Sequence, residues 1–244
     1  MKTVRAMFCL LSLLAGTAAA LPATAAEWLV VIRSNSQEWP QGTKIDGTAV
    51  LTLGEGAQLT LLSEDGLSMT IPGPYSAAPL LTKPEHSQQG LIESLSPLLS
   101  NPSNDETVIG AFRTSDDDRE ALAWMIDAAI LRENSGVICR DASRTLTIAR
   151  PKSAEATRVL LERLGSEVRA EFIFPPNSAT VLWPVAVPAD EGAHFRLTIA
   201  GRSAPSEFSI ALLPTDLPTP AHRAAWMADH GCRVQARRLI LSSY

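Results

Sequence analysis

Short apolar runs separated by turn residues form the main pattern of the chain, and they predict β-strands. The first runs are four or five residues long and rich in Val, Leu, Ile and Thr, and glycine-bearing turns separate the later ones. Runs of this length between turn residues are typical of strands. We expect a buried strand at the first run and a meander at the next three, ended by Pro72. The runs are Trp28–Ile32, Ala49–Leu53, Gln58–Leu62 and Ser68–Ile71.

The second half of the chain repeats this pattern and predicts an antiparallel β-sandwich. In the run that starts at His194, apolar and polar residues alternate, so one face of that strand packs in a core and the other meets solvent. Pro184 falls inside another run, which predicts an edge strand or two short strands bent at the proline. Strands at this spacing are typical of a sandwich. They are Val137–Cys139, Leu146–Ala149, Ala170–Phe174, Thr180–Val187, His194–Ala200 and Glu207–Leu213.

Two internal segments carry apolar patterns that fit helices. Residues 153–164 place their apolar side chains at helical spacing, so we expect a helix there. Ser115 and Asp116 suit a helix cap, and the apolar residues 122–131 follow them. That second segment is so uniformly apolar that a buried strand fits it as well.

The end of the chain predicts one long helix. Thr219 suits its N-cap and Pro220 its first helical position. Small apolar residues then recur at helical spacing, and we expect this stripe to pack on the sheet. Arg223, Arg233 and Arg237 lie largely off the stripe, and Arg237 and Arg238 suit the negative end of the helix dipole. The stripe contains Ala221, Ala225, Ala228, Cys232, Ala236 and Leu239.

These elements group into a mainly β chain of the α+β class. Between the two β-rich parts, proline, serine and asparagine replace the periodic pattern and predict a linker, with one or two helical turns at Leu91–Leu99. The predicted division is a signal peptide at 1–26, an N-terminal β-module at 27–76, a Pro/Ser-rich linker at 77–107, a β-sandwich-like domain at 108–216, and a docked C-terminal helix at 217–244.

Residues 1–26 have the composition of a cleaved signal peptide. Lys2 and Arg5 precede the apolar segment Ala6–Ala15, and the small residues Ala23–Ala26 close the leader. This order of a basic region, an apolar region and a small-residue cleavage site is typical of exported proteins. The apolar run is about half the roughly 20 residues that span a membrane, so an anchor fits less well. We expect a periplasmic or secreted protein whose mature chain has no transmembrane segment.

Cleavage of the leader removes Cys9 and leaves Cys139 and Cys232 in the mature chain. Two cysteines in an oxidising compartment are most simply a disulfide. A metal pair and a catalytic thiol are the alternatives, but neither cysteine has a Cys-x-x-Cys partner, and zinc needs further ligands. We therefore predict a bridge that holds the terminal helix on the second β-region.

Composition and motifs argue against several functional classes. The net charge of -5, without a run of Lys or Arg, provides no surface for nucleic acid. The sequence has no Gly-x-Ser-x-Gly elbow, no phosphate-binding glycine loop and no paired-histidine motif, so we predict no cofactor and no metal site. The acidic run Ser115–Asp118 fits a helix cap better than a calcium loop, because calcium ligands alternate along their loop. We expect the histidines to be surface groups: His86, His194, His222 and His230.

Carboxylate and tryptophan side chains are compatible with a protein that cleaves or binds carbohydrate. A glycosidase needs only two carboxyl groups brought together in space, and Glu171, Asp190 and Glu191 lie near predicted turns. Tryptophans form sugar-binding platforms when they are exposed. We expect Trp28, Trp124 and Trp183 in the core and only Trp39 and Trp226 available at the surface.

The segment Gly42–Tyr75 (GTKIDGTAVLTLGEGAQLTLLSEDGLSMTIPGPY) resembles the β-rich segments of FecR-like periplasmic domains. Its short strands alternate with glycine turns as they do in that family. The resemblance implies an exported β-module and carries no expectation about iron signalling.

Taken together, the patterns favour an exported, non-catalytic protein that binds a protein or envelope partner through sheet edges and loops. The alternative is a periplasmic hydrolase whose carboxylate pair is assembled only in the fold. An exposed apolar strip on a solid sandwich favours the first function, and a deep pocket with converging acidic groups favours the second.

Overall fold

A computed structural model of the 244-residue chain describes residues 28–79, 90–100, 121, 123–128, 131 and 136–244. This part of the chain is mainly β, as predicted, with 14 strands in four sheets and 3 helices. The predicted signal peptide at 1–26, a short apolar run at 108–112 and the predicted cap residues Ser115 and Asp116 lie outside the described residues.

The N-terminal module consists of a four-stranded sheet and a two-stranded sheet. The larger sheet has the order β2-β1-β4-β5, and β3 pairs with β6. The predicted meander is therefore wrong at β3, because β4 pairs with β1 and β5 instead. The strands are β1 (Trp28–Ser34), β2 (Lys44–Asp46), β3 (Leu51–Leu53), β4 (Gln58–Ser63), β5 (Ser68–Pro72) and β6 (Tyr75–Ala77).

Gly73 explains how the chain crosses from β5 to β6 beside β3. Its amide donates to the carbonyl of Ala57 at 2.7 Å. A Cβ at this position would lie 2.0 Å from the carbonyl oxygen of Gly54, so only glycine permits the close approach. The proline-glycine-proline segment thus starts a further strand, where the sequence predicts an end to the sheet.

Both faces of the large N-terminal sheet are covered, which is why β1 and β4 read as continuous apolar runs. Leu29 and Val31 face the cluster shared with β3 and β5. Val30 and Ile32 alternate with them and face the opposite cluster, which contains the helices.

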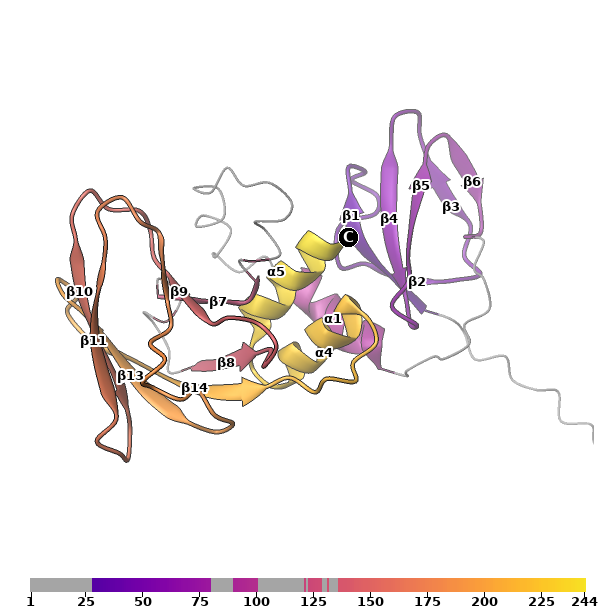
Figure 1. Ribbon diagram of the computed structural model, residues 1–244. Helices are drawn as coiled ribbons and strands as arrows, with labels where there is room; N and C mark the ends of the chain where they lie inside the picture. The colour runs from indigo at the N-terminus through magenta and orange to yellow at the C-terminus, as the bar shows by residue number, and fades with distance from the viewer. Residues whose placement is uncertain (1–27, 80–89, 101–120, 122, 129–130, 132–135) are drawn as a thin grey trace, which may run out of the picture.

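The helices form a middle layer between the N-terminal sheet and the C-terminal strands (Figure 1). They are α1 (Leu91–Ser100), α4 (Pro220–Asp229) and α5 (Arg233–Ser243). Helix α1 stands inside the predicted linker and extends through Pro97, where the sequence predicts at most two helical turns. Five of its side chains are buried, and their burial outweighs the hydrogen bond that the proline removes. They are Leu91, Ile92, Leu95, Leu98 and Leu99.

Two helices occupy the place of the single predicted terminal helix. Thr219 caps α4 and Pro220 opens it, as predicted. The helix ends at Asp229, and Gly231 turns the chain with a φ of 87°, a conformation that favours glycine. The predicted stripe still faces the core, because the turn brings Cys232 and Ala236 back against the same cluster.

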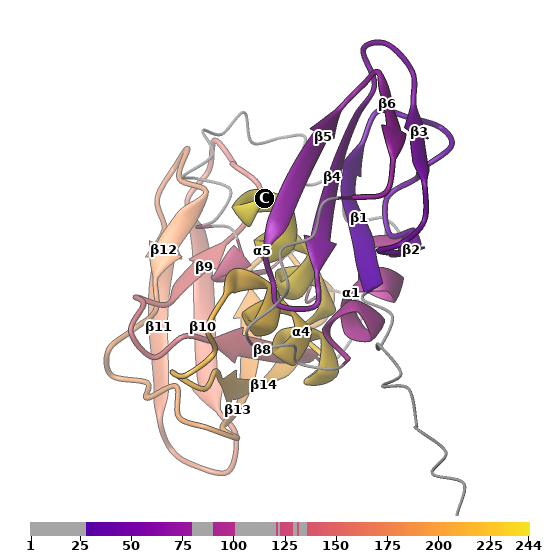
Figure 2. The same cartoon turned by 90° about the vertical axis from the view of Figure 1, so that its right-hand side faces the viewer.

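The β4–β5 turn contacts the helical layer at several points (Figure 2). A carboxylate oxygen of Glu64 accepts from the amide of Ile92 at 3.4 Å, at the start of α1. The carbonyl of Gly66 accepts from the hydroxyl of Tyr244 at 2.9 Å. Burial raises the pKa of the Glu64 carboxyl, and a lesser contribution in the same direction comes from Glu93.

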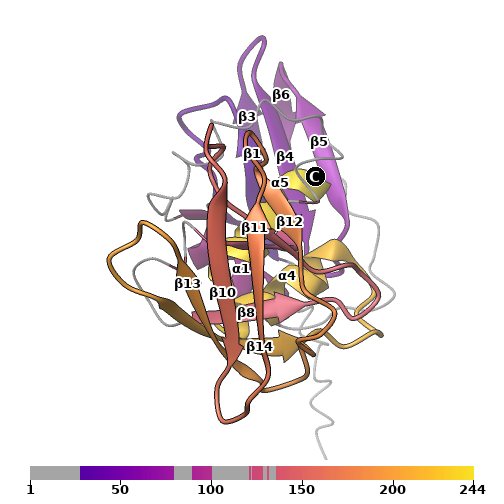
Figure 3. The same ribbon diagram turned by 60° about the vertical axis from the view of Figure 1, so that its left-hand side comes forward.

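The C-terminal strands form a sandwich of a five-stranded and a three-stranded sheet, whose inner faces share one apolar cluster. The orders are β11-β10-β13-β14-β8 and β12-β9-β7 (Figure 3). The prediction of wholly antiparallel sheets is wrong at two pairs, because β8 is parallel to β14 and β7 to β9. The strands are β7 (Met125–Asp127), β8 (Gly136–Arg140), β9 (Thr147–Ala149), β10 (Thr157–Arg163), β11 (Arg169–Phe174), β12 (Thr180–Leu182), β13 (His194–Ile199) and β14 (Ser206–Leu212).

Tertiary pairing corrects the helix predicted at 153–164. The described chain forms β10 there, hydrogen-bonded to β11 on one side and to β13 on the other. Val159 and Leu161 alternate inward, while Leu160, which suits a helical stripe as well, lies half-buried on the outer face. The two neighbouring strands provide hydrogen-bond partners for the backbone of β10. This pairing favours a strand where the spacing of apolar residues also fits a helix.

Other local predictions hold in the sandwich. Phe195, Leu197 and Ile199 of β13 are buried between exposed or half-buried residues, as the alternation predicts. Strand β12 is an edge strand and ends at Leu182, before Pro184. The described part of the ambiguous segment 122–131 contains the strand β7.

Candidate binding surface

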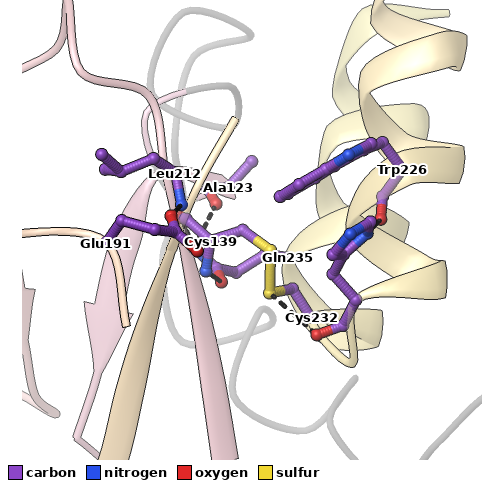
Figure 4. Close-up of a disulfide and its surroundings, with 8 residues drawn as sticks. Ala123, Cys139, Glu191, Leu212, Trp226, Cys232 and Gln235 are labelled. Carbon is purple, nitrogen blue, oxygen red and sulfur yellow. Dashed lines mark hydrogen bonds between the residues drawn. A yellow bond between two sulfur atoms is a disulfide. The ribbon is translucent and has the colours of Figure 1, made fainter. Parts of the chain in front are cut away.

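A disulfide joins Cys139 of β8 to Cys232 in the turn between α4 and α5, as predicted. The sulfur atoms are 2.00 Å apart and the Cα atoms 5.8 Å apart. Both cysteines are buried, and the bridge fixes the helical layer to an edge of the five-stranded sheet (Figure 4).

The side-chain amide of Gln235 covers that same edge, because it bonds the backbone of β8 as a neighbouring strand would. Its Oε1 accepts from the amide of Cys139 at 2.9 Å, and its Nε2 donates to the carbonyl of Cys139 at 3.0 Å (Figure 4). The Nε2 group also donates to the carbonyl of Ala123 at 3.2 Å. One buried amide therefore satisfies backbone groups on two segments, a role that nothing in the sequence pattern of the helix indicates.

A cavity of about 200 Å³ lies beside the disulfide, and a buried ion pair forms part of its wall. Nη2 of Arg238 lies 2.9 Å from Oδ2 of Asp127, and the two side chains are only 6% and 8% exposed. The prediction that Arg237 lies off the packed face is wrong, since Arg237 is buried, as is Arg238. Helix α5 lies in the middle layer, so more of its circumference is covered than one stripe. Arg238 and Asp127 neutralise each other, and Arg233 also lines the cavity.

A second hollow, of about 260 Å³, lies between α1 and α4 and includes His222, Trp226 and Asp229 in its lining. The ring of His230 stacks on Trp226 with centroids 3.7 Å apart. The hydroxyl of Ser94 lies 3.5 Å from a carboxylate oxygen of Asp229. The contact between Ser94 and Asp229 therefore links α1 to α4 across this hollow.

The histidines differ in their surroundings. His222 is buried, contrary to the prediction, and its Nδ1 lies 2.7 Å from the hydroxyl of Thr219. Burial lowers the pKa of His222, while the negative charge of Asp65 acts in the opposite direction. His194 and His230 are exposed, as predicted, and His86 lies outside the described residues.

Each carboxylate considered for hydrolysis has its own structural partner. Glu171 pairs with Arg158 at 2.9 Å, and Asp190 pairs with Arg163 at 2.8 Å. Glu191 accepts a hydrogen bond from the amide of Leu212. These contacts tie the three groups to different strands and loops and show no shared acid-base pair.

The tryptophans follow the prediction in part. Trp124 is buried, and Trp183 packs edge-on against Phe195 with centroids 5.0 Å apart. Trp28 is exposed instead of buried, with the Lys44 ammonium 4.5 Å from its ring centroid. Trp28 is the first residue of β1 and precedes the four buried residues of that strand. Trp39 and Trp226 are half-buried and pack against core clusters, and the ring of His230 stacks on Trp226, so the structure exposes these two rings only in part.

Strand β11 presents an open edge of the five-stranded sheet. The amide of Arg163 donates to the carbonyl of Val168 at 2.9 Å, so these residues form a hydrogen-bonded pair. Hydrogen-bonded and non-hydrogen-bonded pairs alternate along an antiparallel ladder. The backbone N–H and C=O groups of Arg169, Glu171 and Ile173 therefore point away from β10, and their side chains are exposed as well.

Strand β12 presents a second open edge, on the other sheet of the sandwich. Hydrogen bonds from Trp183 to Leu146 and from Arg150 to Ala179 set the same alternation there, which turns the backbone of Leu182 outward. The side chain of Leu182 is 65% exposed, and Val185, three residues on, is 98% exposed. Apolar side chains and free backbone groups thus occur together at this edge.

No protein-family model matches the chain, and searches of curated proteins and of solved structures find no match either. The resemblance of Gly42–Tyr75 to FecR-like domains stays a prediction. Among the described residues no helix is long and apolar enough to cross a membrane, and no group of three or more His, Cys, Asp or Glu is placed to hold a metal ion.

Proposed function

We propose that this is an exported, non-catalytic protein that binds a protein partner at the edge formed by β12 and the residues after it. Export to the periplasm or the medium is proposed from the leader-like composition of residues 1–26. The disulfide supports it, because structural disulfides persist in oxidising compartments.

The observation that carries the proposal is the exposure of Leu182 and Val185 within four residues of one another, at 65% and 98%. Single exposed apolar residues are ordinary, but two neighbours beside an unpaired strand edge form a surface that a partner strand covers favourably. The backbone groups of Leu182 supply hydrogen bonds, and the side chains supply apolar area. Binding by strand addition needs both.

The hydrolase alternative gains no specific support from the described residues. Glu171, Asp190 and Glu191 are held by Arg158, Arg163 and a backbone amide. Each carboxylate thus has a separate structural contact, whereas glycoside hydrolysis needs two carboxyl groups that act on one bond.

Site-specific photocrosslinking in the exporting cell tests the proposal. A photoreactive phenylalanine analogue replaces Leu182 in one variant and Val50 in another, because these residues are 65% and 64% exposed but lie in different parts of the molecule. We expect a discrete adduct of defined mass from position 182 and none from position 50. The same adducts from both positions, or none from position 182 in the exported, disulfide-bonded protein, would contradict binding at this edge.

A further inference from the structure

The outer face of the five-stranded sheet carries a row of alternating charge that runs directly across its strands. The registers place Glu207 opposite Arg196, Arg196 opposite Glu162, and Glu162 opposite Arg169. Nη2 of Arg196 lies 2.7 Å from Oε1 of Glu207. Opposite charges on directly opposed residues stabilise neighbouring strands. The row covers β14, β13, β10 and β11 and ends with the positive charge of Arg169 at the open edge.

A strand added at that edge should place a carboxylate opposite Arg169. The backbone of Arg169 and Glu171 points outward, so two such residues on facing strands can exchange N–H···O=C bonds. Strand β11 itself has the required sequence, because Glu171 follows Arg169 by two residues and lies on the same face.

We propose that β11 pairs antiparallel with β11 of a second copy of this chain, with Arg169 opposite Glu171 of the second copy and Glu171 opposite its Arg169. A twofold axis then passes at Ala170, and Glu171 of the second copy, which also pairs with its own Arg158, adds one carboxylate to the row. A register shifted by two residues would place Glu171 opposite Glu171 of the second copy, and the repulsion between these like charges disfavours that register. The charges thus select one register as well as the partner.

The two edges of the five-stranded sheet differ in a way that supports this pairing. Gln235 and the disulfide close the β8 edge, whereas the outward backbone groups of β11 have no hydrogen-bond partner among the described residues. A twofold contact uses the same edge of both molecules, so the assembly closes as a dimer. The dimer goes beyond the proposed function and does not depend on it, because Leu182 belongs to the other sheet.

Sedimentation velocity of the exported chain over a range of concentrations tests the pairing through charge reversal. Arg169→Glu and Glu171→Arg each set like charges opposite one another twice per dimer, and we expect each to weaken dimerisation about tenfold or more. The double variant Arg169→Glu/Glu171→Arg restores both opposite-charge contacts, so we expect its dimerisation constant to return to near that of the wild type. Arg196→Glu changes the same row away from the edge and serves as the matched control.

Circular dichroism melts show whether each variant retains the fold. A wild-type chain that stays monomeric at all concentrations overturns the proposal. So does a dimer that the single reversals leave unchanged, and so does a folded double variant that fails to recover association, since both results exclude this register. A second readout is Ala170→Cys, which places two thiols at the twofold axis; we expect an intermolecular disulfide on oxidation, and its absence in a folded, dimeric variant also overturns the register.

Discussion

The N-terminal sheet and the C-terminal sandwich are both β-structures, but they cover their apolar faces by different means. In the sandwich, two sheets face one another and enclose a cluster of their own. The large N-terminal sheet has such a cluster on one face only, and its other face depends on α1, α4 and α5. Those helices come from the middle and the end of the chain, so the first strands need residues more than 150 positions away to be covered.

This difference shows that the helical layer supports the two β-parts unequally. The sandwich contributes to the helical cluster at one end only, through Cys139, Ala211 and Leu213 and through Ala123 and Trp124, which precede β7. The strands β10 and β11 lie at the far side of the sandwich from the helices (Figure 1). Loss of the layer should therefore expose a whole face of the N-terminal sheet and only one end of the sandwich.

Removal of the disulfide should have the largest effect on this arrangement. The bridge closes a loop with a sequence separation of 93 residues, and we expect Cys139→Ala/Cys232→Ala to lower the free energy of unfolding by about 4 kcal/mol. Urea unfolding followed by circular dichroism measures the change. Hydrogen exchange should rise in α4 and α5 first and leave β10 and β13 protected. A loss below about 1 kcal/mol would mean that packing alone holds the helices in place.

Three buried leucines allow the comparison to be sharpened, because each belongs to a different cluster. Leu95, Leu61 and Leu161 are all fully buried, in the helical, the N-terminal and the sandwich cluster respectively. Replacement of each by Ala should cost about 3 kcal/mol through lost burial and a cavity.

Hydrogen exchange should then distinguish the three variants by location. We expect Leu95→Ala to increase exchange in both β1 and β8, Leu61→Ala only in the N-terminal sheet, and Leu161→Ala only in the sandwich. Equal increases across the molecule in all three variants would show a single cooperative unit and remove the distinction between the two β-parts.

The smallest expected effect is a pH dependence at the contact between the β4–β5 turn and α4. Burial lowers the pKa of His222 in the folded protein, so the folded state disfavours its protonation. Stability should therefore fall as the pH drops through about 6.5, the ordinary value for histidine. Asp65, Thr219 and Tyr244 are the other titratable or hydrogen-bonding groups at this contact. Thermal melts between pH 7.5 and 5.5 measure the slope, and His222→Gln should flatten it; an unchanged slope in that variant would assign the dependence to another group.

Several features followed from local pattern. The glycine and proline turns, the alternation in β13 and the cap of α4 depend on residues close in sequence, so the sequence predicts them directly. The disulfide was predictable because the chain after residue 26 contains only two cysteines. The open edge at β12 was likewise signalled by Pro184.

The errors share a cause, since each concerns a residue whose environment comes from a distant segment. Residues 157–163 fit a helix by spacing and become a strand because β11 and β13 flank them. Residues 91–100 resemble a linker by composition and become a buried helix because α4 and the N-terminal sheet cover them. The sequence predicts only a helix-dipole role for Arg238, and its burial depends on Asp127, 111 residues away, which neutralises it.

By itself, the sequence determined the mainly β class, most strand positions and the cysteine pair, because strand alternation, turn residues and a count of cysteines are local or compositional properties. Only the tertiary structure decided which strands are neighbours, which edge Gln235 closes and which edge stays open at Arg169, Glu171 and Ile173. Those features depend on register and on contacts between segments far apart in the chain, and many registers satisfy the same alternation of apolar and polar residues.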